Sequence, residues 1–305
     1  MQTLRIISRN SPLALRQAEL VKCRLNTLYP DLRMSIFGVT TLGDKILDKS
    51  LDKIGGKGLF IKELELALLE GRAEIAVHSL KDLPANLLPE FSLAAILERE
   101  DASDAFVSNS YPSLDSMPET MVIGTSSLRR VAFLKRYYPK LTTKLLRGNF
   151  QTRLKKLDEG EYDGIIVATA GLNRLNLAGR IRESLSVELF IPAIGQGALA
   201  VEILANNLEL NNLLAPLTDP NTFIEVVAER EVGRYLKASC SVPIAVHARI
   251  RGNQFRLKAM VADSEEDIFC FAEVVTVRNN YMEAALDCAK QLLNQGALKV
   301  LKKFS

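Results

Sequence analysis

The sequence has no tryptophan, only two histidines and only four cysteines among its 305 residues. The cysteines are far apart and form no Cys-x-x-Cys pair, which argues against a zinc site or a disulfide scaffold and is typical of a reduced, cytoplasmic protein. Because His78 and His247 are its only histidines, the chain has no His-rich metal centre and few candidates for a Ser-His-Asp triad. We therefore expect no bound metal.

Long apolar runs and a strong charge imbalance are also absent. No run of about 18 apolar residues is present, so we expect no transmembrane helix, and the N-terminus has no signal-peptide core. The net charge is +3, from 39 basic and 36 acidic residues, which is too balanced to indicate nucleic-acid binding. We expect a cytoplasmic monomer with no membrane, nucleic-acid or obligate protein partner.

The length suggests two or three domains, and strand and helix patterns alternate along the first 170 residues. The first half predicts strand 4–8, helix 12–28, strand 34–40, helix 61–69 and strand 74–80. The second half predicts strand 121–124, helix 128–138, strand 142–146, helix 149–157 and strand 162–169. Ser11-Pro12 marks a helix start, with Ser as the N-cap. Each β-α-β-α-β half predicts a mostly parallel sheet with helices on both faces.

The remaining chain follows another pattern. It predicts a long helix over 222–238, antiparallel strands over 242–251, 254–263 and 269–277, and a last helix over 281–293. This order indicates a small α+β domain. Residues 190–205 lie between the two patterns, and Pro192, Gly195 and Gly197 suggest that they form a bent connection.

Cationic side chains follow the predicted strands at the points where the strands end. Ligands of open α/β sheets bind outside the carboxyl ends of the strands, so we expect these residues to converge on one cleft. Six arginines are placed in this way: Arg9, Arg129, Arg130, Arg147, Arg153 and Arg174. Guanidinium groups match carboxylates or phosphates in pairs, and Thr125-Ser126-Ser127 adds hydroxyls and N–H groups at a helix start. A single arginine of this kind is more often a surface ion-pair partner, but six together favour a polyanionic ligand.

Asp82 is the lone acid of this predicted basic site, and Lys81 lies beside it. A carboxylate surrounded by cations stays ionised, and it could stabilise a developing cation or move a proton. Capping a turn is an equally ordinary role for Asp.

Two further segments have open interpretations. The loop Gly55-Gly56-Lys57-Gly58 lacks the spacing of a phosphate-binding loop, so we interpret it as a lid that carries Lys57, or as a plain flexible loop. Cys240 lies between the long helix and a strand, and it is a nucleophile, an attachment point or an inert thiol. Cys23, Cys270 and Cys288 look structural, and His78 is expected to be a satisfied core residue.

Taken together, the chain resembles the porphobilinogen deaminase (hydroxymethylbilane synthase) family. The resemblance covers nearly the whole chain and rests on long motifs in order. These are RNSPLALRQAE (9–19), GKGLFIKELE (56–65), AVHSLKDLP (76–84), GTSSLRR (124–130), RGN (147–149), ATAGLNRL (168–175) and GQGALAVE (195–202).

The resemblance implies a fold of two doubly wound domains like those of periplasmic binding proteins, followed by a small C-terminal α+β domain with a three-stranded antiparallel sheet. It implies domain 1 over residues 1–97 and 198–216, domain 2 over 98–197 and domain 3 over 217–305. The segment 190–205 is then the second crossing between the first two domains.

The resemblance also implies a transferase of haem biosynthesis. The enzyme condenses four porphobilinogens with loss of ammonia onto a dipyrromethane cofactor, held by a thioether on Cys240, and then releases hydroxymethylbilane by hydrolysis. Asp82 is the implied catalytic residue. Implied cofactor contacts are Cys240, Lys81, Asp82, Thr125, Ser127, Arg129, Arg130, Arg147, Gly148 and Asn149. Implied substrate contacts are Arg9, Ser11, Lys57, Arg153, Arg174 and Gln196.

Two other functions stay open on the residues alone. One is a non-catalytic binding protein for an anionic metabolite, which needs no cysteine adduct. The other is a cysteine-dependent acyltransferase or hydrolase, in which His247 is the nearest basic partner in sequence for Cys240.

Overall fold

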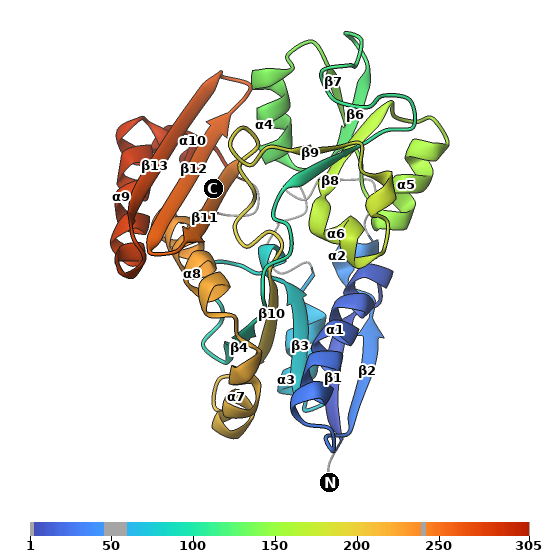
Figure 1. Ribbon diagram of the computed structural model, residues 1–305, viewed down its shortest axis with the longest axis vertical. Helices are drawn as coiled ribbons and strands as arrows, with labels where there is room; N and C mark the ends of the chain where they lie inside the picture. Colours follow the sequence, from blue (N-terminus) through green and yellow to red (C-terminus); the bar gives the residue numbers. More distant parts are fainter. Residues whose placement is uncertain (1–2, 46–59, 239–241, 305) are drawn as a thin grey trace.

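The computed structural model describes residues 3–45, 60–238 and 242–304, and it is an α/β structure built on three sheets (Figure 1). The expected fold class is confirmed: two five-stranded sheets carry helices on their faces, and a three-stranded antiparallel sheet with helices follows them.

The first sheet has the strand order β2-β1-β3-β10-β4. Its strands are β1 (Leu4–Arg9), β2 (Met34–Val39), β3 (Ile75–Ser79), β4 (Phe91–Ile96) and β10 (Leu199–Leu204). Only β10 runs antiparallel to its neighbours, so four of the five strands point the same way. Successive residues of a strand face opposite sides: Ile6 packs in the core beneath α1 (Pro12–Leu28) and α7 (Leu208–Leu214), and Ile7 packs beneath α3 (Lys62–Leu69).

The second sheet repeats this arrangement with the order β7-β6-β8-β5-β9. Its strands are β5 (Asp104–Val107), β6 (Val122–Thr125), β7 (Thr142–Leu145), β8 (Gly164–Ala168) and β9 (Glu183–Leu185), and its helices are α4 (Leu128–Tyr137), α5 (Phe150–Asp158) and α6 (Thr169–Arg174). Here β5 is the antiparallel strand. The predicted mostly parallel sheets are thus confirmed, but each contains one reversed strand that the sequence patterns did not predict.

The third sheet, β11-β12-β13, consists of β11 (Ile244–Arg251), β12 (Gln254–Asp263) and β13 (Ile268–Val277). One face packs against α8 (Pro220–Tyr235), α9 (Tyr281–Asn294) and α10 (Ala297–Lys303). The other face places Ala245, Met260 and Ala262 in one core with Phe106 and Phe133 of the second sheet and α4. The sheet therefore stands directly beside α4 (Figure 1). Short elements complete the chain: α2 (Leu42–Lys45), η2 (Leu80–Asp82), η3 (Ala178–Arg180), η4 (Ala215–Leu217) and η5 (Arg278–Asn280).

Two connections join the first two sheets, and both are tied to α8. The chain passes from β4 to β5 through Arg99, and it returns from β9 to β10 through Gly195. The connection expected over 190–205 is shorter than predicted, because residues 199–204 form the strand β10, which lies between β3 and β4. The guanidinium of Arg99 donates to both carboxylate oxygens of Glu229 on α8, at 2.7 and 3.1 Å, and to the carbonyl of Gln196 at 2.8 Å. Glu229 also accepts from the N–H of Gly195 at 2.7 Å.

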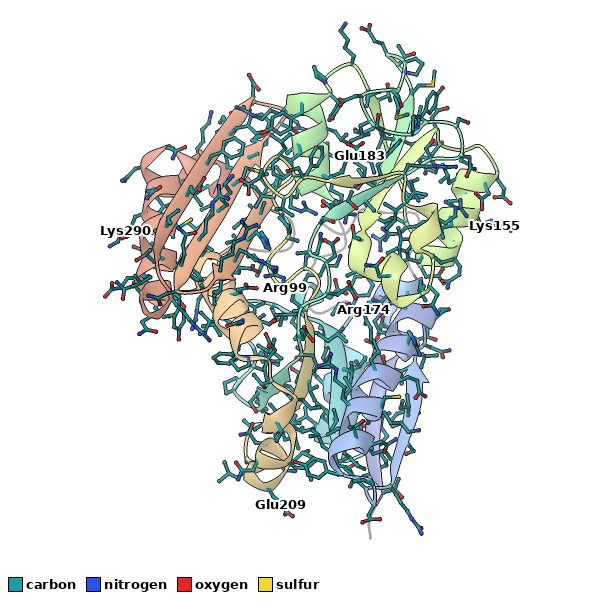
Figure 2. All side chains as sticks on the ribbon, viewed as in Figure 1. Arg99, Lys155, Arg174, Glu183, Glu209 and Lys290 are labelled. Carbon is teal, nitrogen blue, oxygen red and sulfur yellow. The ribbon has the colours of Figure 1, made fainter. Side chains whose placement is uncertain are left out.

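This Arg99–Glu229 pair is buried at mid-height of the molecule, where Figure 2 labels Arg99. The pair holds both connections to one helix, so it fixes how the chain crosses between the sheets. The domain bounds given above stay a prediction.

We predict that Arg99→Met lowers the free energy of unfolding by about 3–5 kcal/mol, because it leaves the buried charge of Glu229 without its partner. The matched control is Arg24→Met, which removes an exposed ion pair with Glu98 and should cost less than about 1 kcal/mol. Guanidinium-induced unfolding measures both changes. Equal shifts of the two unfolding midpoints would contradict the prediction.

Candidate functional site

Residues from both large sheets meet at the carboxyl ends of the parallel strands. Arg9 ends β1, and β3 runs into the short helix η2, which carries Lys81 and Asp82. Arg153, on α5 of the second half, lies near charged residues of both halves. Its pKa falls to about 10 because of burial, with further lowering by Arg130 and Arg147, an opposing effect of Asp82 and a smaller lowering by Arg9. The structure thus brings Arg153 near Arg130, Arg147, Asp82 and Arg9.

A second acid lies in this site, so the expectation that Asp82 is its lone acid is wrong. Asp104, the first residue of β5, is completely buried. Its carboxylate accepts from Arg130 at 2.7 Å and forms an ion pair with Arg129 at 2.8 Å. Burial by itself raises the pKa of Asp104, but the two guanidinium groups outweigh it and hold that pKa far below its usual value. One carboxylate is thus shared by two cations, which leaves an excess of positive charge.

Gln196 connects this buried acid to Lys81. Its side-chain amide nitrogen donates to Asp104 at 2.9 Å and to the carbonyl of Ala102 at 2.7 Å. Its amide oxygen accepts from the ammonium of Lys81 at 3.4 Å. Gln196 is buried, and both ends of its amide are engaged within the protein. The amide of Gln196 therefore links the carboxylate of Asp104 to the ammonium of Lys81.

Lys81 has a strongly altered environment. Burial lowers its pKa to about 8, and the nearby positive charges of Arg130 and Arg129 act in the same direction, whereas Asp82 and Asp104 oppose them. An additional carboxylate beside Lys81 would be bound favourably, because an added negative charge stabilises the ammonium form.

Two other arginines are anchored through backbone carbonyls. Arg153 donates through Nε to Gly148 at 2.8 Å, and Arg174 donates through Nη2 to Gly197 at 2.6 Å. Burial lowers the pKa of Arg174 to about 10. Gly148 has φ +112°, and a Cβ there would lie 2.7 Å from the side chain of Thr152, so this turn requires glycine. Arg147, directly before Gly148, is buried and lies near Arg153.

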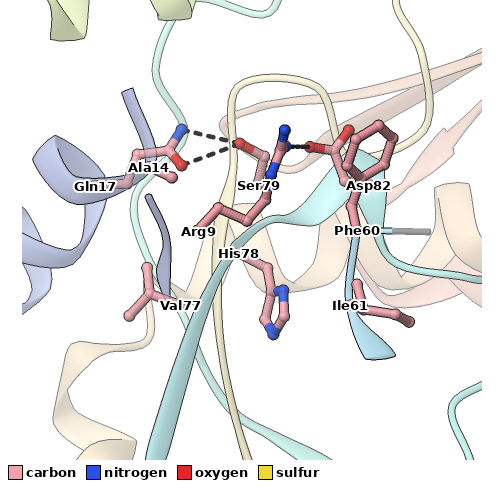
Figure 3. A pocket seen from close by; sticks show the side chains of 9 residues that line it. All are labelled: Arg9, Ala14, Gln17, Phe60, Ile61, Val77, His78, Ser79 and Asp82. Atoms are coloured by element: carbon pink, nitrogen blue, oxygen red, sulfur yellow. Dashed lines mark hydrogen bonds and ion pairs between the residues drawn. The ribbon is translucent and has the colours of Figure 1, made fainter. Parts of the chain in front are cut away.

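Arg9 lies on the opposite side of the site, next to Asp82. Its guanidinium contacts both carboxylate oxygens of Asp44, stacks 4.3 Å from the ring centre of Phe60 and lies 4.0 Å from the carboxylate of Asp82. Figure 3 shows Arg9, Phe60 and Asp82 around one cavity of about 20 Å³. Thr41 also donates to Asp44 at 2.8 Å, which fixes the carboxylate that orients Arg9.

The neutral residues of the expected site lie at helix starts. Ser11 caps α1, Ser127 caps α4 and Asn149 caps α5, each through a side-chain oxygen that accepts from a backbone N–H. A capping serine keeps its own O–H proton and a capping asparagine keeps its NH₂ group as donors. Thr125 is buried at the end of β6, where its hydroxyl accepts from the N–H of Ser127 at 3.3 Å.

Both histidines lie against glutamates. The Nε2 of His78 lies 2.9 Å from a carboxylate oxygen of buried Glu202, so the expectation of a satisfied core histidine is confirmed. The Nδ1 of His247 lies 3.5 Å from Glu229. Cys23 is exposed, and Cys270 and Cys288 are buried. Cys240 and Lys57 lie outside the described residues.

Two negative findings concern the described part of the chain. In residues 3–45, 60–238 and 242–304, no group of three or more His, Cys, Asp or Glu side chains is placed to hold a metal ion. Within the same ranges, no helix combines the length and the apolar character that crossing a membrane requires.

Sequence reasoning missed Asp44 and Asp104. The sequence around Asp104 shows no recognisable strand pattern. The partners of Asp104 lie in α4, which begins 24 residues later. Once β5 is placed inside the sheet, a charged residue at its start must be paired. The need to pair Asp104 can therefore be recognised from the tertiary structure but not from the sequence.

Two solved structures have a similar arrangement of the chain. A putative methionine-binding lipoprotein from Bacillus subtilis matches 73% of this chain and 93% of its own, with 14% identity and a TM-score of 0.45. The periplasmic VFT2 domain of Bordetella pertussis BvgS matches 70% of this chain and 86% of its own, with 15% identity and a TM-score of 0.43.

Similarity of sequence is much stronger. The porphobilinogen deaminase of Laribacter hongkongensis is 52% identical over 302 residues, which cover 99% of this chain and 98% of that protein. The porphobilinogen deaminase of Thiobacillus denitrificans is 51% identical over 301 residues, which cover 99% and 98%.

Two family models match as well. "Porphobilinogen deaminase, dipyromethane cofactor binding domain" matches residues 4–212, and "Porphobilinogen deaminase, C-terminal domain" matches residues 223–295. These matches together span both large sheets, the cationic site and the third sheet. The chain therefore belongs to the porphobilinogen deaminase family.

Proposed function

We propose that this protein is a hydroxymethylbilane synthase, which joins four porphobilinogens head to tail with loss of ammonia and releases the linear product by hydrolysis. The observation that supports this proposal most strongly is the uncompensated positive charge at the strand ends. Each porphobilinogen carries an acetate and a propionate, so a growing chain brings two negative charges per unit. The shared carboxylate of Asp104 neutralises only one of the two guanidiniums around it.

The residues present fit a dipyrromethane cofactor. The Nε atoms of Arg129 and Arg130 are buried without a hydrogen-bond partner among the described residues, and an unpaired buried donor favours a ligand that accepts from it. We propose that these two arginines, with Arg147 and Lys81, hold the cofactor carboxylates. Thr125, Ser127, Gly148 and Asn149 lie beside them as neutral contacts. When bound through Cys240, the dipyrromethane supplies the free α-carbon to which new pyrrole units are added.

We further propose that Arg9, Arg153 and Arg174 bind the carboxylates of the incoming substrate. Each of the three is held by a partner that orients its guanidinium. Ser11 lies at the start of α1 on the Arg9 side, and Lys57 is proposed as a further cation. Gln196 acts through Lys81, since its own amide is engaged within the protein.

Asp82 is the proposed catalytic residue. Loss of ammonia from the aminomethyl carbon of porphobilinogen breaks a C–N bond and leaves an electron-poor azafulvenium. A carboxylate about 4 Å from such a cation stabilises it by about 4 kcal/mol at an effective dielectric constant near 20, which corresponds to about a thousandfold in rate. The side chain of Asp82 keeps 36% of its accessible surface, so its carboxylate is open to an approaching substrate. After the new C–C bond forms, the same carboxylate can accept the proton that leaves the α-carbon.

We also propose that the enzyme works as a cytoplasmic monomer without nucleic-acid or protein partners. The thiols of Cys23, Cys270 and Cys288 are free, which is the usual state of cytoplasmic cysteines.

We predict that the purified protein carries an excess mass equal to two pyrrole units and that Cys240→Ser carries none. Intact mass spectrometry measures both, and Cys23→Ser is the matched control that should keep the adduct. The same experiment separates the alternatives: a binding protein or a thiol hydrolase would show no adduct in any form. An adduct that persists in Cys240→Ser would move the attachment point to another residue.

We predict that Asp82→Asn lowers kcat by about a thousandfold while the circular dichroism spectrum stays unchanged, and that Asp82→Glu keeps part of the activity. Asp31→Asn, at an exposed position distant in sequence, serves as the control and should keep full turnover. Ammonia release and tetrapyrrole absorbance give kcat. Turnover of Asp82→Asn close to that of the unsubstituted enzyme would exclude this role.

We predict that porphobilinogen binds cofactor-free Cys240→Ser protein more weakly as the pH rises through the Lys81 pKa of about 8. Deprotonation removes one positive charge above that pH, and a hydrogen bond to a charged group contributes about 1.5–3 kcal/mol, so the affinity should fall by roughly ten- to a hundredfold. Adding Lys81→Arg keeps the charge and should abolish the pH dependence. Calorimetric titrations between pH 7 and 9.5 test this, and an identical decline in both proteins would rule Lys81 out as its cause.

A further inference from the structure

The loop behind Asp82 is held by a residue from the third part of the chain. Asp82 is the last residue of η2, and Leu83, Pro84 and Ala85 follow it. The guanidinium of Arg230, on α8, donates through Nη2 to the carbonyl of Pro84 at 2.8 Å and to the carbonyl of Ala85 at 3.0 Å. Among the described residues, these two bonds join α8 directly to the backbone two and three positions after Asp82.

One stripe of α8 is shaped for this contact. Val226, one turn before Arg230, packs in the core that contains Leu80 and Leu83, the residues on either side of Lys81 and Asp82. Gly233 follows Arg230 by three positions, and a Cβ there would lie 2.8 Å from Ile194 and 3.9 Å from Ala85. Residues three and four apart share one helix face. Val226, Arg230 and Gly233 therefore form a single surface that fits η2 and the loop after it.

The charge of Arg230 is not explained by an ion pair. Its guanidinium instead donates to the two carbonyls, and its Nη1 is buried without a hydrogen-bond partner among the described residues. Burial lowers its pKa to about 10, and nearby Arg234 lowers it further, whereas Glu202 raises it. Keeping a buried guanidinium on two carbonyls costs desolvation energy. A short apolar side chain would fill the same helix position at a lower cost.

We infer that Arg230 is a positioning residue for catalysis, which fixes the Asp82 carboxylate relative to α8. This inference rests on the proposed function of Asp82. The two carbonyls hold the chain immediately after Asp82, and the buried Leu80 and Leu83 side chains hold it from below. The helix α8 thereby sets the direction of the Asp82 side chain. The same helix carries Glu229, which accepts hydrogen bonds from Arg99 on the first crossing and from Gly195 on the second. Any shift of α8 is transmitted to Asp82 through Arg230.

A double-mutant cycle in the full-length holoenzyme tests the inference. Arg230→Met should lower kcat ten- to hundredfold with KM changed less than threefold, because misplacing a catalytic group by about 1 Å can cost a hundredfold in rate. Arg230→Lys, which can still donate to both carbonyls, should recover most of the loss. Arg234→Met, on the same helix in an exposed ion pair with Glu231, should keep kcat within twofold.

The decisive measurement is the effect of Arg230→Met in the Asp82→Asn background. If Arg230 acts through Asp82, the second substitution should lower kcat less than twofold further, since coupled residues are not additive. The same fold loss in both backgrounds would overturn the inference, as would unchanged kcat in Arg230→Met alone. Circular dichroism and intact mass confirm folding and cofactor content, and Arg230→Gln replaces Arg230→Met in the cycle if the latter does not fold. Absence of ammonia release by the unsubstituted protein would overturn the proposed function itself, whereas ammonia release with an additive cycle overturns only the role of Arg230.

Discussion

The site depends on how Asp104 is shared between Arg129 and Arg130. A single buried carboxylate orients two guanidinium groups, and Gln196 extends the same network to Lys81. One negative charge is enough to hold the arginines in place but not enough to neutralise them. The remaining charge is kept in a low-dielectric setting, where it acts strongly on any added anion. Removing one of two guanidiniums would leave the structure neutral there but unable to attract a carboxylate.

This network lies where the two connections between the large sheets meet. Asp104 begins the strand that the chain enters after its first crossing, and Gln196 lies on the second crossing. Arg99 and Glu229 tie both crossings to α8, and Arg230 on the same helix reaches the loop after Asp82. The residues proposed to bind anions and the proposed catalytic acid are therefore linked through one helix.

Local signals in the sequence predicted the elements that frame the site. The helix starts at Ser11, Ser127 and Asn149 are confirmed as side-chain caps, since a cap depends only on residues three or four positions away. The strands β4, β5, β9 and β10 were not predicted, because their place in a sheet depends on pairing with strands far along the chain. For the same reason Asp104 and Asp44 were not predicted as site residues, since only the tertiary structure brings their arginine partners near. Arginines at strand ends could be recognised from the sequence, but how far they are neutralised could not.

The central claim is that uncompensated guanidinium charge, rather than shape alone, gathers the pyrrole substrate. The most direct test compares calorimetric binding of porphobilinogen and of its dimethyl ester to cofactor-free Cys240→Ser protein at neutral pH. Each carboxylate that meets a cation should contribute about 1.5–3 kcal/mol, so the account predicts that the ester binds at least about a hundredfold more weakly. Equal affinities for the acid and the ester would contradict it.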